Sequence, residues 1–273
     1  MSAQPWEVLA LRYAERGART RADSFLLDDD HAGPHAMDYF VWLLRQGARA
    51  VVVDTGYDAA EGARRGRPVL RDPAAALLAF GVAPDAVDTV IVTHLHYDHA
   101  GGLARFPAAT LHLQAAEMAY ATGPCMGHAV LRAPFTAEHV CETVRRLHAG
   151  RVVLHEGEAE VAPGVSVHPV GGHSRGLQAV RVLTRAGWLV LASDAAHYHE
   201  NWLLEKPFPI VVDVEAMLRG FQTIRRLASA RELVIPGHDP LVRRLFPRAD
   251  GPPEAWRLDT GPAARLDERG RLA

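Results

Sequence analysis

The sequence predicts an α/β fold in which two β-sheets pack together and helices cover their outer faces. The chain passes from strands to helices twice, with a similar unit in each half, which is the pattern of two packed layers. Hydrophobic residues make up 48% of the 273 positions, enough for a large core and too few for a membrane protein. We expect one domain over residues 1–273, with a C-terminal tail over residues 248–273.

The first third of the chain predicts strands. Glu7–Tyr13, Tyr39–Leu44 and Arg49–Val53 are rich in apolar and aromatic residues, and Gln46-Gly47 supplies a turn between the last two. These two strands are expected to form an antiparallel hairpin that ends at Asp54-Thr55-Gly56.

Turn signals place the next two elements. Asp72-Pro73 offers an N-cap followed by a proline at the first helical position, and Gly81 offers a stop, so we expect a helix over Pro73–Phe80. Val87–Thr93, apart from Asp88, predicts a buried strand that leads into a histidine-rich segment.

The rest of the chain alternates in the same way. Thr136 is expected to cap a helix that runs to about Ala149, because Gly150 follows. Apolar residues at helical spacing predict a helix over Val214–Ala228, and the residues after Pro247 predict a wrapped or partly mobile tail. The other expected elements are a helix at Ala115–Ala121 and strands at Thr110–Leu113, Val152–Leu154, Val165–Val170, Ala179–Leu183, Trp188–Ala192 and Glu232–Ile235.

Composition argues against several classes of protein. The net charge is −2 with both signs interspersed, which gives no electrostatic footprint for nucleic acid or an anionic membrane. The segment Met1–Glu7 lacks the basic start and apolar stretch of a signal peptide. Cys125 and Cys141 are too few for a disulfide framework. We therefore expect a cytoplasmic protein with neither a nucleic-acid nor a membrane partner.

Histidine is unusually common, with fifteen residues, and several cluster beside Asp and Gly where expected strands end. Strand ends are where a rigid scaffold delivers side chains to a cleft. The four segments are His94-Leu95-His96-Tyr97-Asp98-His99, Gly171-Gly172-His173, Ser193-Asp194 and Pro236-Gly237-His238-Asp239.

The first segment has the geometry of a metal site. At a spacing of two, His94 and His96 point the same way and can bind one ion, whereas Asp98 and His99 are displaced toward a second. Imidazole and carboxylate suit zinc and tolerate manganese, iron or cobalt. Asp194 is the natural bridge between ions that lie about 3.5–4 Å apart. A single histidine is more often a surface residue than a ligand, but a cluster this dense has no packing purpose.

With Asp54-Thr55-Gly56, these segments resemble the metallo-β-lactamase superfamily from about Tyr39 to Asp239. The resemblance implies an αββα four-layer sandwich of two mixed β-sheets flanked by helices, with the site along one edge. It also implies a complete set of ligands, in which one metal is held by His94, His96 and His173, the other by Asp98, His99 and His238, and Asp194 lies between them.

Within that superfamily the chain is similar to the N-acyl-homoserine lactonase (quorum-quenching) branch, in Asp98 beside His99, the bridging Asp194 and Gly237-His238-Asp239. True β-lactamases usually carry a cysteine ligand in the second site, where this chain has Asp194. Flavin-linked di-iron members replace the second histidine by glutamate, and His96 argues against them.

The branch resemblance implies a hydrolase that opens a lactone ring by attack of a hydroxide bridging two divalent ions, most simply Zn²⁺. Asp98 would relay the proton to the leaving alkoxide. Such lactonases commonly place a tyrosine three residues after the bridging aspartate, whereas this chain has His197 there and Tyr198 one residue later. One of these two residues would help to polarise the substrate, or both are loop residues without a catalytic role. The resemblance also suggests a homodimer.

Residues for the substrate pocket are harder to choose from sequence. The loop over Thr20–Met37 is long for a hairpin connection, as functional lids often are, although we favour a solvated face for its acidic run Asp28-Asp29-Asp30. Candidate apolar or aromatic pocket residues, for each of which core packing or a dimer contact is the alternative, are Met37, Tyr39, Met126, Phe135, Trp202 and Phe208.

Other activities of the same metal site remain open. A glyoxalase-II-like thioesterase, or a hydrolase of another ester or lactam, is the main alternative. A thioesterase for glutathione conjugates would be expected to have a basic pocket in a C-terminal helical extension, and the tail after Pro247 is too short and broken to supply one. A nucleic-acid-processing member would need a basic patch and extra domains. The complete ligand set argues against an inactive metal-binding protein.

Overall fold

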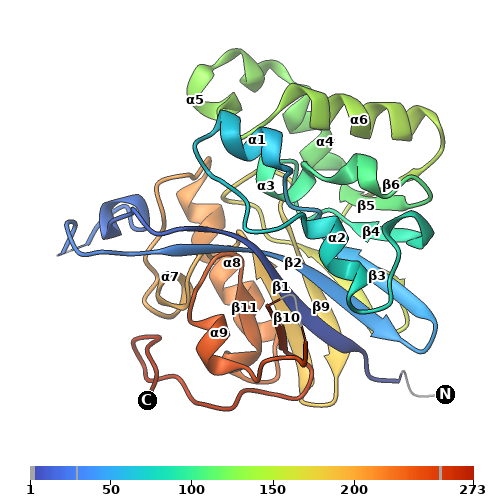
Figure 1. Cartoon of the computed structure of the whole chain (residues 1–273). Coiled ribbons are helices and arrows are strands. Elements are labelled where there is room, and N and C mark those ends of the chain that lie inside the picture. Colours follow the sequence, from blue (N-terminus) through green and yellow to red (C-terminus); the bar gives the residue numbers. More distant parts are fainter. Residues whose placement is uncertain (1–3, 29, 252–253) are drawn as a thin grey trace.

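Two mixed β-sheets lie face to face at the centre of the computed structural model, which describes residues 4–28, 30–251 and 254–273 (Figure 1). In the first sheet the strand order is β12-β1-β2-β3-β4-β5-β6, and in the second it is β11-β10-β9-β8-β7. The first sheet comprises β1 (Glu7–Arg16), β2 (Met37–Gln46), β3 (Arg49–Val53), β4 (Thr89–Ile91), β5 (Thr110–Gln114), β6 (Val152–His155) and β12 (Ala255–Arg257). The second comprises β7 (Ala159–Ala162), β8 (Val165–Pro169), β9 (Gln178–Thr184), β10 (Gly187–Ser193) and β11 (Val234–Pro236).

Both sheets combine parallel and antiparallel pairs. The pairs from β1 to β3 are antiparallel, including the predicted hairpin of β2 and β3, and those from β3 to β6 are parallel. In the second sheet only the β10–β11 pair among the described strands is parallel. Because parallel neighbours end at the same edge, β3 and β4 deliver their following loops to one end of the first sheet, as β10 and β11 do in the second.

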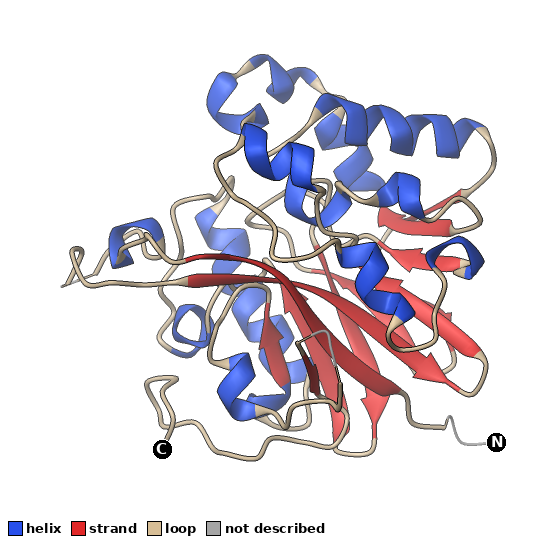
Figure 2. Ribbon diagram, in the orientation of Figure 1, coloured by secondary structure: helices blue, strands red, loops and turns tan. Residues whose placement is uncertain are grey.

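Helices cover the outer face of each sheet (Figure 2). Residues of α2, α3, α4 and α6 pack in the core on the outer face of the first sheet, and those of α7 and α8 pack on the second. The helices are α1 (Ala59–Arg64), α2 (Pro73–Leu78), α3 (Tyr97–Ala100), α4 (Ala115–Ala121), α5 (Ala129–Arg132), α6 (Ala137–His148), α7 (His199–Leu203), α8 (Val214–Leu227) and α9 (Val242–Leu245).

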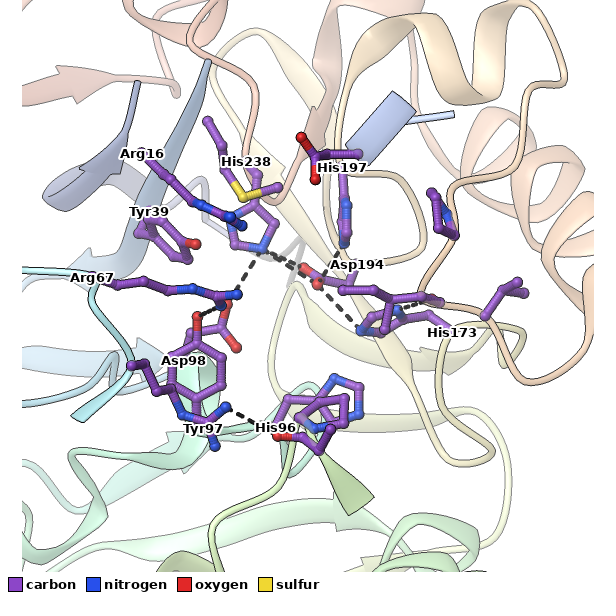
Figure 3. A pocket seen from close by; sticks show the side chains of 18 of the residues that line it. Arg16, Tyr39, Arg67, His96, Tyr97, Asp98, His173, Asp194, His197 and His238 are labelled. Carbon is purple, nitrogen blue, oxygen red and sulfur yellow. Dashed lines mark hydrogen bonds and ion pairs between the residues drawn. The ribbon is translucent and has the colours of Figure 1, made fainter. Parts of the chain in front are cut away.

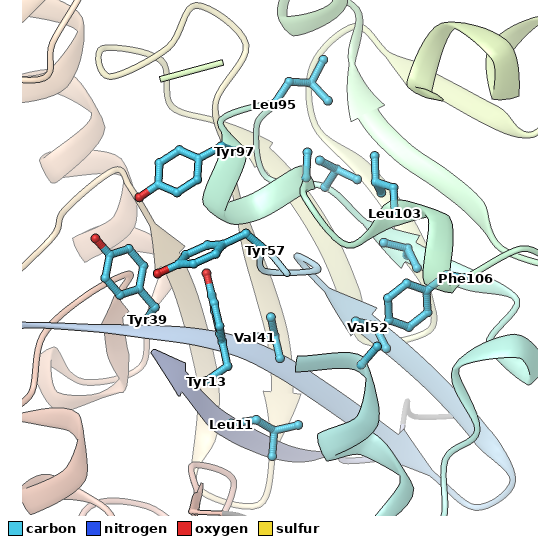
Figure 4. Close-up of a cluster of buried hydrophobic side chains, with 14 of the residues drawn as sticks. Leu11, Tyr13, Tyr39, Val41, Val52, Tyr57, Leu95, Tyr97, Leu103 and Phe106 are labelled. Atoms are coloured by element: carbon cyan, nitrogen blue, oxygen red, sulfur yellow. The ribbon is translucent and has the colours of Figure 1, made fainter. Parts of the chain in front are cut away.

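The four layers follow from the alternation of side chains along each strand. In β2, Val41 packs under the helices of the first sheet (Figure 4), whereas Trp42 packs between the sheets. In β10, Leu191 faces the first sheet and Val190 faces α8. Both faces of both sheets are therefore buried, and the predicted αββα sandwich is confirmed.

Several element boundaries differ from the sequence predictions. The strand expected over Val87–Thr93 is paired only over Thr89–Ile91, because a 3-10 turn precedes it and a buried side chain binds the backbone after it. The strand expected from Glu232 starts at Val234, after a second 3-10 turn. Thr136 occupies the predicted N-cap of α6, but its hydroxyl donates to Glu61 Oε1 at 2.8 Å instead of capping the helix.

The C-terminal tail is wrapped onto the first sheet. β12, which the sequence did not predict, pairs with β1 in the register Leu9 with Arg257 and Leu11 with Ala255. This pairing supports the proposal that residues 1–273 form one domain; residues 252–253 of the tail lie outside the described residues. None of the described helices has the length and apolar character needed to cross a membrane.

The loop before β2 is tied to the rest of the protein by charged side chains. Asp28 is not solvated, contrary to the sequence prediction, because Arg21 and Lys206 pair with its carboxylate, which is 4% exposed. Arg21 also pairs with Glu200 of α7 at 2.7 Å. Asp30 is exposed as expected, and Asp29 lies outside the described residues. These ion pairs hold the loop against α7.

Replacing Leu189 by alanine is expected to lower the free energy of unfolding by about 2–5 kcal/mol, because it leaves a cavity between the sheets. Leu189 is fully buried there. Leu27 is 83% exposed, so Leu27→Ala is the matched control and should change stability by less than about 0.5 kcal/mol. Urea unfolding of both variants checks this, and equal losses would contradict the inter-sheet core.

Candidate metal centre

The four histidine- and aspartate-bearing segments converge at one edge of the sandwich (Figure 3). His94 to His99 follow β4, Asp194 follows β10 and His238 follows β11, all beyond carboxyl ends of parallel strands. His173 arrives from the loop between β8 and β9. The convergence is a consequence of topology, since segments up to 144 residues apart leave strands of both sheets at the same edge of the sandwich.

Two groups of ligand atoms match the sets that the sequence resemblance implied. His94, His96 and His173 offer nitrogens within 4.8 Å of one another, and all three are buried. Asp98, His99 and His238 form a second group by the same measure. Three buried ligands on each side are the number that holds a catalytic metal with a coordination position left open.

Asp194 lies between the two groups. Its Oδ1 is 3.3 Å from His99 Nε2 and 3.1 Å from His238 Nε2, whereas its Oδ2 is 3.3 Å from His173 Nε2. Each carboxylate oxygen therefore faces a different group, which is the arrangement of a carboxylate that bridges two ions.

The polar atoms at the centre fit divalent cations. His94 Nε2, His99 Nε2, His173 Nε2 and Asp194 Oδ1 are buried and have no hydrogen-bond partner among the described residues. Unpaired buried polar atoms are costly and rare in native proteins. Two divalent ions would coordinate these atoms, so the residues present fit the metal centre.

Burial also prepares most of the imidazoles to act as ligands. It lowers the pKa of His94 and of His96 well below the usual value, and that of His173 as well, so these rings are neutral. At His99 burial acts in the same direction, but the negative charges of Asp194 and other carboxylates outweigh it and raise the pKa.

Outer hydrogen bonds fix the ring orientations. The Nδ1 atoms of four imidazoles face away from the centre, each toward an oxygen of a neighbouring residue: His99 toward Asp54 Oδ2 at 2.7 Å, His173 toward the Ile210 carbonyl at 2.6 Å, His238 toward the Asp38 carbonyl at 2.9 Å, and His94 toward Thr93 Oγ1 at 3.1 Å. A partner at Nδ1 sets the tautomer and leaves the Nε2 lone pair for metal.

Asp54 is a supporting residue whose role the sequence did not reveal. It follows β3, is fully buried, and accepts hydrogen bonds from the backbone and hydroxyl of Thr93 at 2.7 and 2.8 Å. The same carboxylate holds His99. Its φ of 57° lies in the left-handed region, which aspartate and asparagine tolerate better than most residues. The Asp54-Thr55-Gly56 turn therefore positions the second metal group.

Glu117 joins the two loops that carry the first metal group. Its buried carboxylate accepts the Leu95 N–H at 2.9 Å and the Gly176 N–H at 3.0 Å, and the Ser174 hydroxyl as well. Burial raises its pKa, and these hydrogen bonds oppose the rise. An acidic residue at the start of an ordinary helix gave no sequence signal of this role.

The two residues predicted to polarise the substrate are placed differently. His197 lines the cavity, stacks on Phe208 with ring centroids 3.6 Å apart, and lies 2.9 Å from Asp194 Oδ2 through its Nε2. Burial lowers the pKa of His197 to about 3, so the ring is neutral and can donate a proton to that hydrogen bond. Tyr198 is not among the residues that line the cavity; its hydroxyl donates to the Ala36 carbonyl at 3.1 Å.

A cavity of about 430 Å³ opens above the metal groups. Of the predicted pocket residues, it is lined by Met37 and Tyr39. Phe135 and Phe208 do not line it: Phe135 packs edge-on against the His96 ring, and Phe208 stacks on His197. The remaining two predicted residues, Met126 and Trp202, do not line the cavity and pack against hydrophobic clusters instead.

The cavity also has walls that sequence reasoning missed. One is apolar and comes from the residues around α5 and from the loop before α8. The other is basic, and no pattern distinguished its arginines in a chain that uses arginine throughout. The apolar wall contains Val130, Leu131, Ala133, Pro134, Pro209, Ile210, Val211 and Val212, and the basic one Arg16, Arg19, Arg65 and Arg67.

Comparison with known families agrees with this geometry. The model of the metallo-beta-lactamase superfamily matches residues 37–253, which is most of the chain. The chain belongs to the metallo-beta-lactamase superfamily. Its fold is that of this superfamily, and its buried histidine and aspartate groups are of the kind that holds metal ions.

Curated relatives of this superfamily member include lactonases. It is 29% identical to an N-acyl homoserine lactonase from Azorhizobium caulinodans over 191 residues, covering 67% of this chain and 71% of the relative. It is also 29% identical to an N-acyl homoserine lactonase from Bacillus cereus over 161 residues. That match spans 58% of each chain, so less than two thirds of the Bacillus protein is represented.

Solved structures of known lactone hydrolases share the fold. An N-acyl homoserine lactone hydrolase with the product N-hexanoyl-L-homoserine at its catalytic metal center superposes with a TM-score of 0.69 and 23% identity, covering 88% of this chain and 95% of that one. AidC, a dizinc quorum-quenching lactonase, has a TM-score of 0.67 and 13% identity, with coverage of 98% and 97%.

Replacing Asp54 by asparagine is expected to weaken metal binding at the Asp98, His99 and His238 group by about 10–100-fold, because the neutral side chain supports His99 less well. Asparagine tolerates the left-handed backbone at this position, so the fold should persist. Asp88→Asn, at an exposed position, is the control. Competition with a chromogenic chelator measures the affinities, and equal affinities in both variants would exclude the assigned role of Asp54.

Proposed function

We propose that this superfamily member is a dinuclear metal hydrolase that opens the ring of N-acyl homoserine lactones or related lactones. The observation that carries the proposal is the position of Asp194 between two three-ligand groups at the floor of a cavity. Lactonases among both the curated relatives and the solved structures support the choice of a lactone.

We propose Zn²⁺ as the resident metal. The donor set is rich in imidazole nitrogen and contains no thiolate, which suits zinc and also accepts manganese, iron or cobalt. The dizinc lactonase of the same fold supports this choice.

Two bound ions would supply Lewis acidity toward the substrate carbonyl and a water acidic enough to ionise near neutral pH. Ring opening also requires that the leaving ring oxygen gain a proton. Asp98 lines the cavity, with Oδ2 at 3.8 Å from both His99 Nε2 and His238 Nε2. We assign to its carboxylate the transfer of a proton from the attacking water to that oxygen.

Other residues position the substrate and the bridge. His197 holds Asp194 Oδ2 by its Nε2 proton, and this hydrogen bond limits rotation of the bridging carboxylate. Tyr39 lies beside the His238 ring, with centroids 5.0 Å apart, and presents its hydroxyl to the cavity. The apolar wall from Val130 to Pro134 and from Pro209 to Val212 would receive an acyl chain or an aromatic group.

Thioester hydrolysis is the second candidate, and the basic wall of the cavity favours it. We expected a thioesterase for glutathione conjugates to carry its basic pocket in a C-terminal helical extension. The arginines instead come from β1, the loop after it and the loop before α2, whereas the tail forms β12 on the far side of β1.

The metal-loaded protein is expected to hydrolyse lactones in a panel of short- and long-chain acyl homoserine lactones, an aromatic lactone, a thioester and a cephalosporin. Release of acid at constant pH measures every member of the panel in the same way. Removal of the metal by a chelator should abolish turnover, and added Zn²⁺ should restore it. Turnover of the thioester with inert lactones would replace the lactonase proposal by the second candidate.

Asp98→Asn is expected to keep at least one metal ion per chain and to lower kcat for the lactone about 100-fold or more. The group of His94, His96 and His173 is untouched, whereas the carboxamide cannot accept a proton. Asp30→Asn, at an exposed position of the loop before β2, is the matched control and should retain full activity. Metal analysis and steady-state kinetics check both variants, and full activity of Asp98→Asn would exclude it from proton transfer.

A further inference from the structure

Four arginines line the cavity above the metal groups, more than a site for an uncharged lactone requires. Two of them are committed to holding the fold. Arg65 pairs with Glu61 and donates to the Ala133 and Phe135 carbonyls at 3.0 and 3.1 Å. Arg19 donates to the Asp23 carbonyl at 2.7 Å and to Met37 Sδ. Their guanidinium groups are therefore not free to recognise a ligand.

The other two arginines have donors left over. Arg67 donates one N–H to the hydroxyl of Tyr97, and its remaining nitrogens bind no residue in the described part of the chain. Arg16 is the last residue of β1 and is half-buried, and its side chain makes no hydrogen bond or ion pair with any of the described residues. A guanidinium group has five N–H donors in a planar fork that matches a carboxylate or phosphate.

Both side chains lie on the same side of the cavity. Figure 3 shows Arg16 and Arg67 next to Tyr39, on the side occupied by Asp98 and His238 and away from His96. The apolar residues around α5 and before α8 form the remaining walls. The cavity thus has a basic corner beside one metal group and an apolar surface elsewhere.

Few negative charges are available to neutralise this corner. The carboxylates that line the cavity are Asp23, Asp98 and Asp194. Asp23 accepts the Thr20 N–H at 3.0 Å, and this hydrogen bond, with the charges of Arg19 and Arg16, lowers its pKa. Asp98 and Asp194 belong to the metal groups, so bound ions would balance their charge. Arg16 and Arg67 then face the cavity without a counter-charge other than Asp23.

We propose that the substrate carries an anionic group, a carboxylate or a phosphate, which Arg16 and Arg67 bind beside the Asp98 and His238 side of the metal centre. The inference rests on the proposed function and specifies its substrate class, an acidic lactone or ester. Guanidinium groups that lose water on substrate binding are compensated by an anion and not by an alkyl chain. Arg16 and Arg67 are accordingly specificity-determining residues.

A purely structural role of Arg67 is the alternative, since its bond to Tyr97 would orient a residue of the metal-binding segment. Such a role predicts that a change at Arg67 lowers activity equally for charged and neutral substrates. Arg16 has no comparable structural partner among the described residues, so a variant at Arg16 separates recognition from folding. The comparison of matched substrates in both variants distinguishes the two roles.

The test uses two matched pairs of lactones with the metal-loaded protein. One pair is γ-carboxy-γ-butyrolactone and its carboxamide; the other is the phosphate ester of γ-hydroxymethyl-γ-butyrolactone and the parent alcohol. In at least one pair kcat/KM for the anionic member should exceed that of the neutral member by about tenfold or more, the effect of one charge-assisted hydrogen bond. The pair with the larger ratio identifies the anion as carboxylate or phosphate.

Arg16→Gln and Arg67→Gln should each lower that ratio by about tenfold while changing kcat/KM for the neutral member much less. Arg145→Gln is the matched control, because Arg145 is 71% exposed on α6. High salt should reduce the ratio of the parent protein, as expected for recognition by charge. Equal rates within both pairs, or variants that slow both members of a pair equally, would overturn the proposal.

A binding measurement keeps this test separate from the proposed reaction. The ring-opened products, 2-hydroxyglutarate and 4-hydroxyglutaramate, differ by one negative charge. Isothermal titration of the metal-loaded protein should show about tenfold tighter binding of the dianion, lost in Arg16→Gln. If no lactone is hydrolysed but the dianion binds preferentially, the reaction is wrong and the recognition stands. If the lactones are hydrolysed but the anion is preferred neither in rate nor in binding, the proposed reaction stands and the anion-recognition proposal is wrong.

Discussion

The buried carboxylate of Asp194 is the charge on which the whole site depends. It is almost inaccessible to water and lies within 3.3 Å of nitrogens from His99, His173, His197 and His238. A buried carboxylate is costly unless it is paired, and the crowded imidazoles around it compensate it only in part. Divalent cations remove the conflict, because every group in the cluster is a good ligand for them. Metal binding therefore contributes directly to the stability of the folded chain.

The protein holds these ligands by means that do not involve metal. Asp54 fixes His99 from the end of β3, and Glu117 fixes the loops of His94 to His96 and of His173 from α4. Gln178 adds a link between the sheets, since its side chain donates to the Val92 and His112 carbonyls. The loops that carry the ligands are thus held both where they leave the sheets and along their course. A rigid frame of this kind supports precise metal geometry.

The sequence predicted the parts of this protein that depend on local pattern. The αββα layers follow from alternation along strands such as β2. The histidines clustered at strand ends indicated metal binding, whereas the division of the ligands into two groups came from the resemblance to the superfamily. It did not predict residues that act through distant contacts. Tyr198 and His197 are adjacent in sequence, yet only His197 lines the cavity, because Tyr198 is the N-cap of α7 and its hydroxyl binds the loop before β2. The arginines of the basic corner also escaped prediction, since their direction depends on how loops from separate regions fold together.

The strand β12 has a consequence for the behaviour of the protein in solution. Without β12, β1 would be the outermost strand of the first sheet. The side chains of its ten residues are largely buried, but its outer backbone N–H and C=O groups would be unpaired. Long exposed edges of this kind recruit strands from other molecules, which leads to self-association. Three residues of the tail pair with β1 over part of this edge. The short C-terminal segment therefore limits self-association through this edge. A truncation before Ala255 would uncover the edge of β1 while leaving every residue of the metal centre in place.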